Sequence, residues 1–134
     1  MIRTAWLKAG YMVFVSLFVV SAYAADGEWL TDIEAAKKAA AERKVPILVD
    51  FSGSDWCGWC IKLDKEVFSQ ESFKSFAKDN LVLLLLDFPR KKAQTEEVKK
   101  ANNALAEKYG IEGFPTVLLL DTEGAIIRQY PVIG

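Results

Sequence analysis

Histidine is absent from the 134 residues of this chain, and cysteine occurs only twice. Without an imidazole the chain can form neither a Ser-His-Asp nor a Cys-His catalytic group, nor a metal site with histidine ligands. Two cysteines cannot complete a four-ligand zinc site within one chain, so a metal site would need cysteine pairs from two chains. A basic excess is also lacking, since the formal net charge is −1, and we therefore expect no nucleic-acid partner.

Apolar residues, by contrast, are abundant. They make up 51% of the chain, which excludes an intrinsically disordered protein. The length fits one domain with its own hydrophobic core.

The first 24 residues have the pattern of a secretory signal peptide. A short basic segment is followed by an apolar run at 11–20, and Ala22 and Ala24 occupy the −3 and −1 positions of a cleavage site. We expect residues 1–24 to be removed and residues 25–134 to form an exported domain, periplasmic or secreted. The alternative is an uncleaved membrane anchor, although the apolar run is short for a bilayer span.

The two cysteines, Cys57 and Cys60, are separated by two residues where a predicted strand ends and a predicted helix begins. A helix N-terminus presents unpaired N–H groups and a partial positive charge, which favour a thiolate. In such a Cys-x-x-Cys pair the thiol pKa can fall to roughly 3.5–7.5 from about 8.5. One turn of helix also brings the two sulfurs close enough for a disulfide. The pattern indicates disulfide exchange in an oxidising compartment.

Asp50 interrupts the apolar strand that precedes the cysteines. Its carboxyl group lies either in the interior near the thiols or at the solvated end of the strand. A charge among apolar neighbours is costly unless it has a partner or a function, which favours the interior position.

Helices and buried strands alternate along the rest of the chain, which predicts a mixed sheet covered by helices. Thr31 is the predicted N-cap of the first helix, and Trp29 before it is expected to pack in the core. The basic segment 88–92 is expected to be a solvated connection, with partner docking as the alternative. The other expected elements are helices at 57–68, 72–79 and 95–109, strands at 81–86 and 117–120, and a hairpin to 125–130. The predicted buried faces of the later helices are Phe73, Phe76 and Ala77, and Val98, Ala101, Leu105 and Tyr109.

Two motifs together resemble the thioredoxin superfamily. Trp56-Cys57-Gly58-Trp59-Cys60 follows a Val-Asp-Phe strand, and Gly113-Phe114-Pro115-Thr116 comes about 55 residues later. The sequence is most similar to exported thioredoxin-like proteins with a Trp-Cys-Gly-x-Cys site, over about residues 28–130.

The resemblance implies an α/β thioredoxin-like fold with a mixed central sheet flanked by helices. It also implies a catalytic role for three residues: Cys57 as the exposed attacking thiolate, Cys60 as the buried resolving cysteine, and Asp50 as the acid that exchanges a proton with Cys60. Pro115 would be a cis-proline facing the disulfide. The substrate-binding residues would be Trp56, Gly58, Trp59, Phe114, Pro115 and Thr116.

This sequence departs from the family pattern in three places. Trp59 stands where thioredoxins usually have proline, which leaves the direction of catalysis open. The loop from Asp50 to Cys57 is one residue longer than usual. The helix that normally follows the hairpin is missing before Gly134, so we expect an apolar sheet face near 125–130 to be uncovered and to favour self-association.

The sequence therefore predicts a thiol–disulfide oxidoreductase that acts on protein substrates through Cys57 and Cys60. We expect no metal or organic cofactor, since the redox-active disulfide carries the chemistry. A redox partner protein would exchange electrons with it. The alternatives are a binding or assembly module of the same fold with a structural disulfide, and metal binding between chains.

Overall fold

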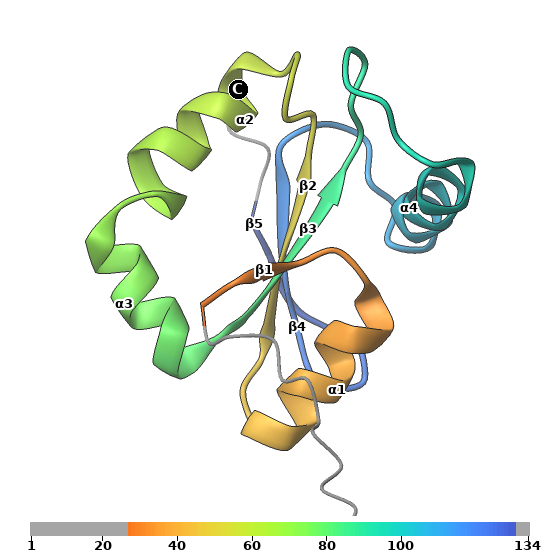
Figure 1. Ribbon diagram of the computed structural model, residues 1–134. Coiled ribbons are helices and arrows are strands. Elements are labelled where there is room, and N and C mark those ends of the chain that lie inside the picture. The colour runs from red at the N-terminus through yellow and green to blue at the C-terminus, as the bar shows by residue number, and fades with distance from the viewer. Residues whose placement is uncertain (1–26, 131–134) are drawn as a thin grey trace, which may run out of the picture.

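The computed structural model describes residues 27–130, so the predicted signal peptide lies outside the described residues. A five-stranded mixed sheet lies between helices on both faces (Figure 1). In chain order the elements are β1 (Trp29–Leu30), α1 (Ile33–Arg43), β2 (Ile47–Ser52), α2 (Gly58–Leu63), the π-helical turn η1 (Asp64–Phe68), α3 (Glu71–Asn80), β3 (Val82–Asp87), α4 (Glu96–Lys108), β4 (Thr116–Leu120) and β5 (Ile126–Tyr130). The α/β fold expected from the sequence is confirmed.

The strand order is β1-β3-β2-β4-β5, and β2 lies at the centre. β1, β3 and β2 are parallel, whereas β4 and β5 run antiparallel to their neighbours. The register pairs Phe51 of β2 with Leu86 on one side and Thr116 on the other. The end of β2 is thus flanked by the end of β3 and the beginning of β4.

Alternate residues of β2 point to two separate apolar cores. Ile47, Val49 and Phe51 belong to the core beneath α1 and α4, and Leu48 belongs to the core beneath η1 and α3. Figure 1 shows α2 and α3 on one side of the sheet and α1 and α4 on the other. Trp29 packs against Phe68 in the second core with ring centroids 5.1 Å apart, as expected.

The first helix is capped one residue later than predicted. Asp32, not Thr31, is the N-cap, and its Oδ2 accepts a hydrogen bond of 3.1 Å from the backbone N–H of Ala35. A carboxylate at this position also interacts favourably with the helix dipole, which gives it an advantage over the hydroxyl.

Two predicted buried faces are wrong in part. On α3, Ala77 is buried but Phe76 is 57% exposed. On α4, Val98 and Ala101 are exposed, and Asn102 is buried instead. Its side-chain amide donates a 3.0 Å hydrogen bond to the carbonyl oxygen of Asp87, which satisfies the polar group and keeps this face of α4 against β3.

The hairpin between β4 and β5 is confirmed, and β5 is an edge strand as expected. All five residues of β5 are exposed, including the apolar side chains of Ile126, Ile127 and Tyr130. Among residues 27–130, therefore, an uncovered apolar surface near this strand is present, as the sequence predicted.

Candidate active site

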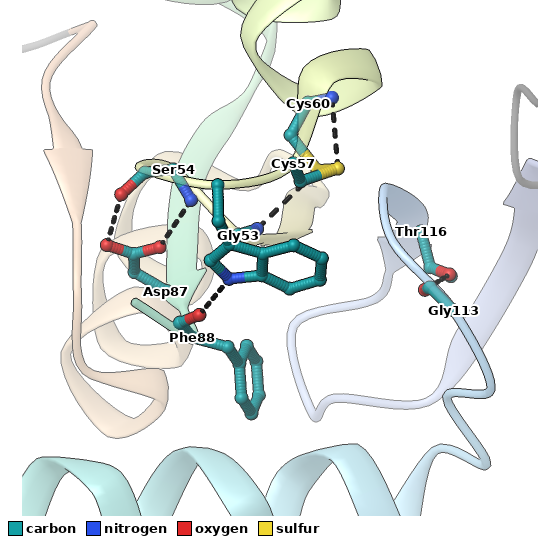
Figure 2. Close-up of a disulfide and its surroundings, with 9 residues drawn as sticks. Gly53, Ser54, Cys57, Cys60, Asp87, Phe88, Gly113 and Thr116 are labelled. Carbon is teal, nitrogen blue, oxygen red and sulfur yellow. Dashed lines mark hydrogen bonds between the residues drawn. A yellow bond between two sulfur atoms is a disulfide. The ribbon is translucent and has the colours of Figure 1, made fainter. Parts of the chain in front are cut away.

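The two cysteines lie at the junction between the central strand and a helix. β2 ends at Ser52, residues 53–56 form a loop that we call the redox loop, and Cys57 is the N-cap of α2. Its sulfur accepts a hydrogen bond of 3.2 Å from the backbone N–H of Cys60, to which it is joined by a disulfide (Figure 2). The backbone N–H of Gly53 lies 3.5 Å from the Cys60 sulfur and donates to it.

The expected exposure of Cys57 is not observed in the disulfide form. Cys57 is 6% exposed and Cys60 is 3% exposed, so both are buried and differ only slightly. The reason is local, because the Cys57 side chain turns back over the helix N-terminus to cap it.

Asp50 is buried, as the sequence favoured. It is 5% exposed, and its Oδ1 atom is buried without a hydrogen-bond partner. Because Asp50 is two residues from Leu48, its side chain lies on the sheet face covered by η1 and α3, the face of the α2 helix. Burial first, and then the carboxylates of Asp64 and Asp87, raise the pKa of Asp50 from 3.8 to about 7.

The two predicted tryptophans differ in their surroundings. Trp56 Nε1 donates a 2.7 Å hydrogen bond to the carbonyl oxygen of Phe88, and its ring meets Phe114 edge to face at 5.8 Å. Trp59 is 49% exposed, with the Lys62 ammonium 5.1 Å from its ring centroid. Trp56 is therefore part of the packed site, whereas Trp59 offers an accessible apolar surface beside the cysteines.

The Phe114–Pro115 peptide bond is cis, and Pro115 is buried. Thr116 begins β4 and is paired with Phe51 of β2, so the turn at 113–115 is brought to the same end of the sheet as the redox loop. The Thr116 hydroxyl donates a 2.6 Å hydrogen bond to the carbonyl oxygen of Gly113, and Figure 2 shows both residues across from Cys57. Gly58 is exposed, and a Cβ there would meet open space.

The structure also brings the segment 87–92 to the site, which sequence reasoning missed. Asp87 accepts hydrogen bonds from both the backbone N–H and the hydroxyl of Ser54, at 3.0 and 2.6 Å. Asp55 accepts from the backbone of the same segment. In the predicted solvated connection only the side chains of residues 90–92 are exposed, whereas Phe88 packs against the core. The backbone of the segment is hydrogen-bonded to the redox loop. The only signal of this attachment in the sequence was the presence of two acidic residues near these loops, Asp55 and Asp87.

In the described part of the chain, no three of the Cys, Asp and Glu side chains are grouped to hold an ion. Among the same residues, no helix has the length and apolar character needed to cross a membrane.

Residues 28–122 match the model of a family described as thioredoxin-like. The chain belongs to the thioredoxin-like family. This identification agrees with the strand, disulfide, helix and cis-proline arrangement described above.

Two curated relatives of this thioredoxin-like protein come from Chlamydia pneumoniae. The disulfide bond reductase DsbH is 39% identical over 101 residues, which are 75% of this chain and 60% of that protein. The thioredoxin-related protein DsbJ is 34% identical over 106 residues, which are 79% of this chain and 30% of that protein. The chain thus spans less than two thirds of the length of either relative.

A solved structure of a DsbH oxidoreductase has a TM-score of 0.74 and 33% identity, over 83% of this chain and 76% of that one. The oxidised C-terminal domain of DsbD from Neisseria meningitidis has a TM-score of 0.56 at 20% identity, over 80% of this chain and 89% of that one. The second likeness concerns the fold alone.

Proposed function

We propose that this thioredoxin-like protein is a thiol–disulfide oxidoreductase that reduces disulfides in protein substrates. The observation that carries the proposal is the Cys57–Cys60 disulfide at the N-terminus of α2, where the Cys57 sulfur accepts the Cys60 N–H. The same contact stabilises a thiolate at Cys57 once the disulfide is reduced. The likeness to a disulfide bond reductase supports the reducing direction.

The proposed reaction has two exchange steps. The Cys57 thiolate attacks one sulfur of a substrate disulfide, a mixed disulfide forms, and the other substrate sulfur leaves as a thiolate. The Cys60 thiol then loses its proton and attacks the Cys57 sulfur. This step releases the second substrate thiolate and restores the Cys57–Cys60 disulfide. A dithiol of a redox partner protein reduces that disulfide again and becomes a disulfide itself.

Asp50 is the proposed acceptor of the Cys60 proton. A carboxyl group with a pKa near 7 can both take up and release a proton at neutral pH. Its position on the face beneath α2 and its unpartnered Oδ1 support this role, because an unsatisfied buried oxygen is free to accept a hydrogen bond.

The proposed substrate surface surrounds the disulfide. Trp56, Gly58 and Trp59 are neighbours of the two cysteines in the chain, and Phe114, Pro115 and Thr116 form the turn and the start of β4 beside the end of β2. Figure 2 shows Thr116 facing Cys57. We expect an extended substrate segment to pair with the Phe114 backbone and to rest an apolar side chain on exposed Trp59.

Trapping of mixed disulfides tests the proposal. Cys60→Ser retains the attacking sulfur but cannot resolve the intermediate, so we expect it to accumulate covalent complexes with a disulfide-containing test protein. Cys57→Ser is the matched control and should trap none. The complexes are measured by non-reducing electrophoresis and mass spectrometry. Equal trapping by both variants, or by neither, would contradict the assignment.

The direction of catalysis is tested by the reduction potential of the Cys57–Cys60 disulfide, measured at equilibrium with glutathione. A reduction potential near about −270 mV would support a reductase, and one near about −120 mV would support an oxidant.

The burial of both cysteines favours one alternative, a binding or assembly module with a structural disulfide. Such a disulfide would resist reduction, with a potential below about −300 mV. The glutathione equilibrium therefore distinguishes the two functions.

We also propose that the protein is exported, on the basis of the signal-peptide pattern in residues 1–24. Expression of the full chain in a bacterium should give a mature protein that begins at Ala25, as measured by the intact mass of the exported fraction. A protein that keeps Met1 and stays with the membranes would instead indicate the anchor.

A further inference from the structure

The side chains of three consecutive residues in the redox loop hold the segment 87–92. Ser54 donates to Asp87, Asp55 accepts from the backbone, and Trp56 donates to Phe88. Cys57 follows them directly in the chain. The contacts between the two segments are therefore placed immediately before the attacking cysteine.

Asp55 makes the most concentrated of these contacts. Its carboxylate accepts three backbone N–H groups in succession, from Arg90 at 2.9 Å, Lys91 at 2.8 Å and Lys92 at 2.7 Å. The hydrogen bond from Arg90, with those from Lys92 and Lys91, holds the pKa of Asp55 below its usual value. The carboxylate therefore stays charged and bound at neutral pH.

The segment bound by Asp55 also carries Arg90, whose guanidinium group lies over the Trp56 ring. The Arg90 guanidinium carbon lies 3.6 Å from the centroid of the indole ring, whose edge faces Phe114. On the redox loop itself, a Cβ added to Gly53 would clash with the indole ring. The half-buried ring is thus contacted by Gly53, Arg90, Phe114 and the Phe88 carbonyl.

We propose that Asp55 is a positioning residue for thiol–disulfide exchange: it fixes segment 87–92 against the redox loop and, through Trp56, holds Cys57 in its capping position on α2. This inference rests on the proposed function for its biological meaning. The reactivity of the Cys57 sulfur, however, can be measured without any protein substrate.

The exposure of the segment bound by Asp55 distinguishes a positioning role of this residue from a contribution to the stability of the fold. Arg90, Lys91 and Lys92 are exposed and Asp55 is half-buried, so N–H groups released from the carboxylate would be hydrated rather than left buried. Loss of Asp55 should therefore loosen the redox loop without unfolding the domain. The Cys57 sulfur would then lose part of its contact with the Cys60 N–H and would be a poorer thiolate.

Asp121 offers a matched control. Its carboxylate also accepts two backbone N–H groups, from Glu123 and Ala125 at 2.9 Å each. It lies in the β4–β5 turn, next to Leu120, which is paired with the first residue of β2. The turn is thus at the end of the sheet away from the cysteines.

The experiment compares Asp55→Ala and Asp121→Ala with the wild type, all as reduced protein. The rate of Cys57 alkylation by iodoacetamide is followed against pH. We expect Asp55→Ala to raise the midpoint of this profile and to lower the rate at neutral pH about fivefold, the size of one lost capping interaction. The Trp56 indole N–H should exchange with solvent about tenfold faster in Asp55→Ala, by NMR, since its loop has loosened. Asp121→Ala should change neither quantity.

An alkylation profile of Asp55→Ala within twofold of the wild type would overturn the proposal. So would an equal change in Asp121→Ala, which would indicate general loosening. Arg90→Gln removes the cation but keeps its backbone N–H, and an effect as large as that of Asp55→Ala would assign the positioning to Arg90 instead. If the alkylation result is as expected but Cys60→Ser traps no substrate, the proposed function fails while the positioning role of Asp55 stands.

Discussion

Asp50 gives the protein a pH dependence at the scale of one carboxyl group. Its raised pKa means that the folded protein keeps a proton between about pH 4 and pH 7 that the unfolded chain has already lost. The free energy of unfolding therefore falls as pH rises through this range. Because Asn cannot ionise, we expect Asp50→Asn to exceed the wild type in stability above pH 7 by about 2–4 kcal/mol.

Urea unfolding of the oxidised protein at pH 5 and pH 8 measures this difference. Asp79→Asn, an exposed position on α3, is the control and should follow the wild type at both pH values. Asp50→Asn should also resolve mixed disulfides more slowly, if Asp50 accepts the Cys60 proton. Parallel pH dependence in Asp50→Asn and the wild type would show that the Asp50 carboxylate is not destabilised by burial.

Single residues also show where sequence reasoning reaches its limit. The cysteine pair and buried Asp50 could be placed because local patterns of strand, helix and charge determine them. Asp55 could not, because its three partners are 35 to 37 residues away and are backbone groups, which every sequence contains. The burial of Asn102 could not be predicted for a similar reason, since its hydrogen-bond partner is the carbonyl oxygen of Asp87, a backbone group.

At the scale of elements, the helices were predicted well in position and less well in orientation. Periodicity located α3 and α4, but it assigned Phe76 and Val98 to the buried side. A helix with few apolar residues can be rotated by one polar contact, as Asn102 does for α4. Apolar spacing alone cannot anticipate such a contact.

The edge strand β5 leads to a prediction about association. Its exposed Ile126, Ile127 and Tyr130 lie on a strand that, within residues 27–130, has no partner on its outer edge, and such edges favour pairing with another chain. We expect residues 25–134 to self-associate in a concentration-dependent manner in sedimentation experiments. Ile127→Lys should weaken the association about tenfold or more, or ~1.4 kcal/mol.

Gln129→Lys is the control for that experiment, since it adds the same charge to the same strand without removing an apolar side chain. A hydrophobic-surface dye provides a second measurement and should bind less to Ile127→Lys. A wild type that remains monomeric at all concentrations and binds no dye would contradict the prediction.

At the scale of the whole molecule, the order of helices and strands could be predicted almost completely. Alternation of apolar strands with helices leaves few topologies, and the resemblance to thioredoxins selected one of them. The attachment of segment 87–92 to the redox loop could not be predicted. It depends on the parallel pairing of β2 with β3, which brings the ends of two strands together although they are distant in sequence.

The pairing changes from parallel to antiparallel at β2, which divides the sheet into two halves. The parallel side, from β2 through β3 in the chain, contains both cysteines with Asp50 and Asp55, and there we place the exchange of disulfides. The facing turn with Pro115 belongs to the antiparallel half, where we place recognition of the substrate backbone. The proposed substrate surface takes Trp59 from the parallel half and the Pro115 turn from the antiparallel half, so it lies across the boundary where the strand direction changes, and we expect substitutions on either side of that boundary to alter which proteins are recognised.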